Sequence, residues 1–118
     1  MKSKGERKIA ELLSQANISF ITEKRFADCV FEDTKRPARF DFYINNQYLL
    51  EYDGRQHLKQ GNGVFDNEEK FNRTQEHDQY KNEWCKNHNI PLIRIPYTHY
   101  NDICLDDLLL ETTIYLVK

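Results

Sequence analysis

Residues 40–53 read FDFYINNQYLLEYD, and this stretch decides the fold class. Aromatic and aliphatic residues that favour β-strands fill both halves. The Asn-Asn-Gln segment at 45–47 suits a tight hairpin turn, because Asn tolerates a positive φ. In a hairpin with its turn there, paired residues have numbers that sum to about 92, so Asp41 lies opposite Glu51. Because strand side chains alternate with a period of two, Asp53 shares a face with Glu51. The stretch therefore predicts an antiparallel hairpin that brings three carboxylates to one patch.

This patch predicts a metal site. Like charges directly opposite one another destabilise a sheet, so a cluster of carboxylates requires a cation. Carboxylate oxygens are hard ligands that select Mg²⁺ or Mn²⁺. The predicted ligands are Asp41, Glu51 and Asp53. The alternative interpretation is that the residues face water, with Asp41 on a solvent-exposed face and Asp53-Gly54 in an ordinary turn.

The segments around the hairpin predict a mixed sheet flanked by helices. Ser3 and Glu6 have the spacing of a capping box, at the start of a helix that ends near Asn17. The further expected elements are a strand over 18–26, a loop over 54–66, a helix over 67–87, a strand over 90–96 and a final helix over 100–116. A helix between two strands implies a crossover, and hence at least one parallel pair. The expected fold is α/β, an α+β mixed sheet in the order αβββαβ with a C-terminal helix, in a single domain over residues 1–118.

Composition excludes some classes of protein. The 118 residues are 39% hydrophobic, enough for one core, and no apolar run approaches the roughly 20 residues of a membrane span. The basic N-terminus is followed by no apolar signal-peptide segment, so secretion is not expected. Three cysteines without a CxxC pair favour reduced thiols. We therefore expect a cytoplasmic protein, whether bacterial, phage-encoded or of a host cell.

Charge is unevenly distributed along the chain. The net charge of −2 argues against a protein that binds nucleic acid by charge alone. Residues 1–39, however, carry nine Lys and Arg against six Asp and Glu, whereas residues 40–118 carry eight against thirteen. A carboxylate site beside a polyanion would have this asymmetry, and ordinary surface scatter is the alternative.

Polar residues near the hairpin are further candidates for catalysis. His57 follows the second strand and could act as a general base, while Gln56 could order a water. Asp78 and Lys81 share a helix face because they are three residues apart, and Lys81 could stabilise charge on a phosphate. Glu6 could complete the metal site. The basic residues expected to meet phosphates are Arg55, Lys59, Lys35, Arg36 and Arg39.

Each of these candidates also has an ordinary structural role available. His57 could be an exposed loop histidine, and Asp78 with Lys81 an ion pair within a helix. Glu6 could serve only as the helix cap, and the metal and cap roles are compatible only if its side chain faces the sheet.

The run EYDGRQH at 51–57 resembles the Glu-x-Asp-Gly-x-x-His signature of the very-short-patch-repair branch of the PD-(D/E)xK nucleases. That branch includes homing endonucleases with a Glu-Asp-x-His-Asp site. The text HDQYKN at 77–82 and IPLIRI at 90–95 is also similar to it, so the resemblance spans about residues 5–97 and implies a restriction-endonuclease-like core. It implies Asp41 as the main metal ligand and Glu51 as the acidic residue of the motif. His57 and Asp78 match the His and second Asp, and Glu6 matches the helix glutamate, for which Glu11 is the competitor.

The activity that the resemblance implies is Mg²⁺- or Mn²⁺-dependent hydrolysis of DNA by an endonuclease or nickase. DNA would be the partner, with a homodimer left open. The lysine of the motif is replaced by Asp53. Either Lys81 supplies the charge from the helix, or His57 takes the role of base, or the chain is inactive.

Two other functions remain open at this point. The chain could be a catalytically inactive nuclease-fold module that binds DNA or a protein. It could also be a ββα-metal nuclease of the HNH class, although the spacing of His57, His77 and His88 fits that class poorly.

Overall fold

The predicted hairpin is formed by β2 (Pro37–Ile44) and β3 (Tyr48–Asp53) in the computed structural model, which describes residues 3–53 and 68–109, the side chains of 68–71 excepted. The two strands are antiparallel, and Phe42 pairs with Leu50, which is the predicted register. Asn45 and Asn46 both have a φ of 53°. That left-handed conformation is what a tight primed turn between twisted strands requires.

Two further strands extend this hairpin into a mixed sheet. β1 (Phe20–Val30) runs antiparallel to β2, and β4 (Leu92–Pro96) runs parallel to β3, so the strand order is β1-β2-β3-β4. The parallel pair is connected through α2 (Glu68–Asn87), the predicted crossover. With α1 (Lys4–Gln15) ahead of β1, the described elements begin in the order αβββαβ. The mixed α/β fold with helices around one sheet is confirmed.

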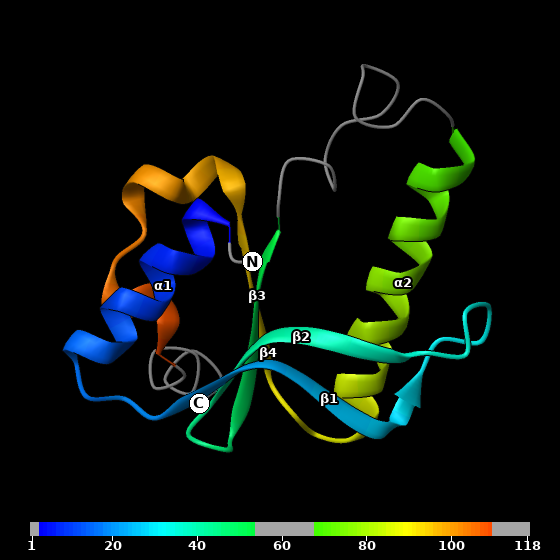
Figure 1. Cartoon of the computed structure of the whole chain (residues 1–118), viewed down its shortest axis with the longest axis horizontal. Helices are drawn as coiled ribbons and strands as arrows, with labels where there is room; N and C mark the ends of the chain where they lie inside the picture. The colour runs from blue at the N-terminus through cyan, green and yellow to red at the C-terminus, as the bar shows by residue number, and fades with distance from the viewer. Residues whose placement is uncertain (1–2, 54–67, 110–118) are drawn as a thin grey trace.

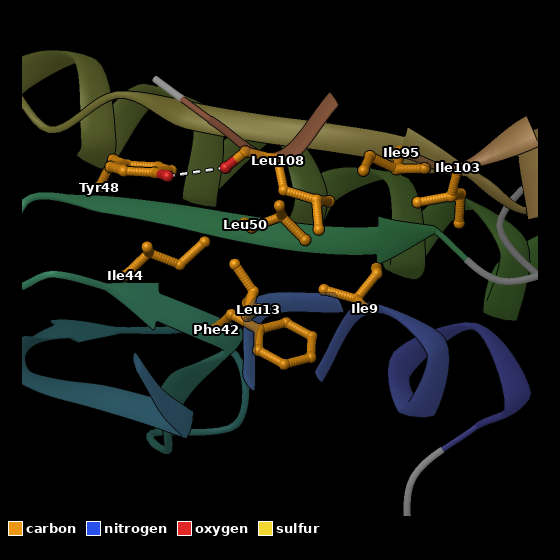
Figure 2. Packing of buried hydrophobic residues seen from close by; sticks show 9 residues of the cluster. All are labelled: Ile9, Leu13, Phe42, Ile44, Tyr48, Leu50, Ile95, Ile103 and Leu108. Carbon is orange, nitrogen blue, oxygen red and sulfur yellow. Dashed lines mark hydrogen bonds between the residues drawn. The ribbon is translucent and has the colours of Figure 1, made fainter. Parts of the chain in front are cut away.

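The two helices cover different parts of the sheet, and each builds its own hydrophobic cluster. Figure 1 shows α1 and α2 on opposite sides of the strands. Figure 2 shows the first cluster, in which α1 contributes Ile9 and Leu13; its other buried members are Phe42, Ile44, Tyr48, Leu50, Ile95, Ile103 and Leu108. The second cluster contains Trp84 and Cys85 of α2, packed with Cys29, Ala38, Phe40 and Leu49. Asp41 lies between these clusters along β2, since it separates Phe40 of the second cluster from Phe42 of the first.

Local signals define both ends of α1. The Ser3 side chain accepts a hydrogen bond from the Glu6 N–H, and the Glu6 side chain accepts one from the Ser3 N–H, so the predicted capping box is present. At the other end, Asn17 has a φ of 59°, and the Ile18 N–H donates to the Leu13 carbonyl oxygen. This closing pattern is a Schellman motif, and it turns the chain out of the helix and toward β1.

The expected C-terminal helix is wrong over residues 100–109. The chain forms two short 3₁₀ segments, Tyr97–Asp102 and Leu105–Leu108, with Ile103 and Cys104 extended between them. Ile103 and Leu108 are nevertheless buried in the first cluster. The apolar spacing that suggested a helix therefore reflects burial of two separate turns, and residues 110–116 of the expected helix lie outside the described part of the chain.

Two further findings concern helices and thiols. Among the described residues, none of the helices combines the length and apolar character needed to cross a membrane. Cys29, Cys85 and Cys104 are not joined in disulfides; Cys29 and Cys85 are buried and Cys104 is exposed.

Candidate active site

Asp41 and Glu51 meet where the pairing of β2 with β3 ends. The Asp41 N–H donates to Glu51 Oε2 at 2.8 Å, and the Tyr52 N–H donates to Asp41 Oδ2 at 2.8 Å. Each carboxylate thus accepts from a backbone donor of the neighbouring strand, beyond the last Cα pair at Phe42 and Leu50. Asp41 is only 6% exposed and Glu51 only 5%. The hairpin register therefore brings together the two carboxylates that it predicted to face each other.

Glu6 reaches the same place from α1. Its side chain hydrogen-bonds that of Asp41 while it also completes the capping box with Ser3. The helix can approach β3 this closely because Gly5 is buried at the contact, where a Cβ would collide with the ring of Tyr52. Glu6 therefore combines the cap and site positions, whereas Glu11, the competing helix glutamate, is exposed.

Burial and neighbouring charge alter the acidity of these groups. Burial, the charge of Glu51 and the hydrogen bond with Glu6 together raise the pKa of Asp41 to about 8. For Glu6, burial acts to raise the pKa, but hydrogen bonds from Asp41 and Ser3 outweigh it, so that the pKa lies below its ordinary value. Their proximity thus favours the protonated form of Asp41 and the charged form of Glu6.

Lys81 of α2 places a positive charge against Glu51. Its Nζ atom donates to Glu51 Oε1 at 2.8 Å and to the Arg39 carbonyl oxygen at 2.7 Å. The ammonium group also lies 4.9 Å from the centre of the Phe40 ring, and the residue is 8% exposed. In the nuclease motif that residues 51–57 resemble, a lysine stands two residues after the acidic residue. Here Asp53 occupies that position, and the ammonium group beside Glu51 belongs to Lys81, thirty positions later.

Asp53 and Asp78 lie in a neighbouring network that is centred on Arg94 of β4. Arg94 donates to Asp53 Oδ1 at 2.8 Å and to Asn82 Oδ1 at 2.9 Å, and its guanidinium lies 3.9 Å from Asp78 Oδ1. Arg94 pairs with Glu51 in the parallel register. Arg94 was not among the site residues predicted from the sequence, although a single charged residue within an apolar strand was the available signal.

Of the remaining residues that the sequence suggested for the site, some lie near the carboxylates and others do not. Arg39 reaches the site, because its guanidinium lies 3.6 Å from Asp41 Oδ1. Lys35 and Arg36 are exposed in the turn between β1 and β2. Arg55, Gln56, His57 and Lys59 lie outside the described residues. His77 and His88, considered for the HNH alternative, contact Asp33 and Asp28 respectively.

Asp41 and Glu51 have the chemistry of metal ligands, although the site is small. Within residues 3–53 and 72–109, no group of three or more His, Cys, Asp or Glu side chains is positioned to hold a metal ion. Magnesium commonly requires only one or two protein carboxylates, with water and substrate phosphate completing its shell. Each bonded oxygen of Asp41 and Glu51 has a second lone pair. The two carboxylates therefore fit Mg²⁺ or Mn²⁺.

Comparison of the chain with protein-family models, with curated proteins and with solved structures finds no match. What Asp41, Glu51 and Lys81 do is therefore inferred from their chemistry and their geometry.

Proposed function

We propose that this chain is an endonuclease that hydrolyses phosphodiester bonds of DNA with Mg²⁺ or Mn²⁺ as cofactor. The observation that supports this most strongly is the buried trio of Asp41, Glu51 and Lys81. Metal-assisted phosphodiester hydrolysis uses a cation bound by oxygen ligands and positive charge near the phosphate. The trio offers both, and the resemblance of residues 51–57 to a nuclease signature points to the same chemistry.

In this proposal Asp41 and Glu51 hold the metal. A bound cation supplies Lewis acidity toward the phosphate and lowers the pKa of a coordinated water. It also offsets the repulsion between two carboxylates that strand geometry forces together. Glu6 lies against the Asp41 carboxyl group and would contribute a further negative charge beside the cation.

Lys81 stabilises the charge that develops during the reaction. A water oxygen bonds to phosphorus while the bond to the leaving oxygen breaks. One water proton ends on the leaving oxygen, which becomes a free hydroxyl, and the other is lost to solvent as the phosphate monoester forms. Negative charge rises on the non-bridging oxygens in between. The Lys81 ammonium is held by Glu51 and by the Arg39 carbonyl, so it is already oriented before charge develops.

Cleavage by purified variants tests the proposal. We expect the wild-type chain to cut supercoiled, branched or single-stranded DNA with Mg²⁺ or Mn²⁺. Asp41→Ala should abolish cleavage, and Lys81→Met should lower the rate about 10²- to 10³-fold, the effect of removing one preorganised donor. Glu11→Gln and Lys86→Met are matched controls, since both residues are exposed on the same two helices. The proposal fails if the wild type cuts none of these substrates.

A binding module on the same scaffold is the second candidate. It is favoured by the absence, within the described residues, of a metal group with three ligands, and by the fact that Lys81 already neutralises Glu51. Calorimetry with Mn²⁺ separates the two functions. Heat of binding that disappears in Asp41→Ala supports the nuclease, whereas tight DNA binding without Mn²⁺ binding supports the module.

A further inference from the structure

Two arginines face each other across β1 and β2 beside the carboxylates. Arg25 and Arg39 are direct partners in the antiparallel register. Directly opposed strand residues have their Cβ atoms about 4.5–5.5 Å apart, and like charges in that position are unfavourable. The sheet therefore carries a close pair of cations, and such a pair is stabilised by an anion.

The neighbours of the two arginines show which face they occupy. Ala38 and Phe40, on either side of Arg39, are buried in the cluster that contains Trp84 of α2. Phe26, next to Arg25, packs on the Trp84 ring with centroids 4.8 Å apart. Because strand side chains alternate, both arginines lie on the face that α2 does not cover.

Both side chains remain accessible on that face. Arg25 is exposed, and the Arg39 side chain is 49% exposed. Among the described residues, the Arg25 guanidinium makes no ion pair or side-chain hydrogen bond. The only ion pair of Arg39 within the same residues is the 3.6 Å contact with Asp41, and the charge of Glu6 also acts on it. The charge of the pair is thus largely uncompensated by the protein.

We propose that Arg25 and Arg39 together bind one phosphate group of the DNA strand, adjacent to the phosphate at Asp41 and Glu51. The guanidinium fork matches phosphate oxygens in a bidentate geometry, and two forks on a rigid sheet can hold one group from two sides. The choice of DNA as the ligand rests on the proposed function. The place of this phosphate next to the carboxylates follows from Arg39, because its guanidinium lies 3.6 Å from Asp41 Oδ1.

The salt dependence of DNA binding tests this pair without requiring cleavage. Fluorescence anisotropy of a labelled duplex and of a labelled single strand is followed in EDTA, from 50 to 200 mM salt. The slope of log K against log salt is negative, and loss of one phosphate contact reduces its magnitude by about 0.9 for a duplex and about 0.7 for a single strand. We expect that loss in the double variant Arg25→Gln/Arg39→Gln, and weaker binding in Arg25→Gln alone.

Matched variants separate this role from general charge and from folding. Lys86→Gln removes one positive charge at the C-terminal end of α2 and should leave the slope unchanged. Arg25→Lys keeps the charge and should retain the slope while binding more weakly, because it lacks the fork. Thermal melting identifies any variant that does not fold. If the double variant is one of these, the DNA affinity of Arg25→Lys is compared with that of the wild type instead.

Three results would overturn the inference. The first is an unchanged slope in the double variant. The second is a reduction in the magnitude of the slope by about twice the expected value, which would indicate two separate phosphates. The third is the absence of DNA binding by the wild type at 50 mM salt. A lowered slope in a chain that never cuts DNA would instead refute the nuclease proposal and leave the phosphate pair intact.

Discussion

Asp41 is the residue on which the candidate site depends. Its carboxyl group accepts from the Tyr52 N–H, hydrogen-bonds Glu6 and lies next to Glu51. Burial, the charge of Glu51 and the hydrogen bond with Glu6 make the charged form costly and raise the pKa of Asp41 to about 8, although the bond from the Tyr52 N–H acts in the opposite direction. The folded chain thus holds Asp41 in a place that disfavours its charged form, and carboxyl groups with such perturbed pKa values cluster at functional sites.

This raised pKa predicts that Asp41→Asn stabilises the protein at alkaline pH. In the unfolded chain Asp41 loses its proton near pH 4, whereas in the folded chain it retains the proton up to about pH 8. Between these values the folded state binds more protons, so the wild type loses stability as pH rises. Asn is neutral and can keep both hydrogen bonds. At pH 8 we expect a gain of at least about 1.4 kcal/mol, the value of one pKa unit.

Urea unfolding at pH 5, 6.5 and 8 in EDTA measures this gain. The difference between Asp41→Asn and wild type should grow with pH, while the exposed Asp106→Asn control should show no such growth. A variant that is less stable than wild type at pH 8 would contradict the predicted cost of charging Asp41.

At the scale of elements, the site depends on how closely α1 approaches β3. Gly5 allows that approach, because a larger residue would meet the Tyr52 ring. The next residue, Glu6, is held by its capping bond to Ser3 and by Asp41. The packing of one helical turn therefore sets the position of a site carboxylate.

Gly5→Ala should destabilise the protein and displace Glu6. Alanine is the better helix former by about 1 kcal/mol, but overpacking a buried contact costs about 1–3 kcal/mol, so the net effect is a loss. Ser14→Ala on the exposed side of α1 is the control and should be neutral or slightly stabilising. Thermal melting measures stability, and equal or higher stability of Gly5→Ala would show that the contact with Tyr52 is not restrictive.

At the scale of the whole molecule, three chain segments converge on one place. α1 contributes Glu6, the hairpin contributes Asp41 and Glu51, and α2 contributes Lys81. A cation bound to these carboxylates would bind the folded chain and not the unfolded one, so it would raise the stability of the entire fold.

Mn²⁺ should therefore raise the melting temperature in proportion to its affinity. At a Mn²⁺ concentration 100 times its dissociation constant, linkage corresponds to about 2.7 kcal/mol. The shift should vanish in Asp41→Ala and persist in Asp106→Ala, which retains the site. If both variants respond to Mn²⁺ like the wild type, the ion binds elsewhere and the metal role of Asp41 is refuted.

Short-range features were determined by the sequence itself. The strand-forming residues of 40–53, the two Asn residues of the turn and the Ser3–Glu6 cap act over a few positions, so they predict the register that sets Asp41 beside Glu51. The same local pattern misled at residues 100–109, because apolar spacing reports burial and cannot distinguish one helix from two short turns.

Long-range contacts were decided only by the tertiary structure. Lys81 reaches Glu51 because the α2 crossover lays the helix over the hairpin, and the pairing of β3 with β4 brings Arg94 to Asp53. From the sequence, Lys81 as the source of the missing charge was one of three alternatives, beside His57 as base and an inactive chain, and Asp53 was predicted to bind the metal. A choice between partners 30 or more residues apart depends on how the helices and strands pack, and hydrophobic periodicity carries no information about it.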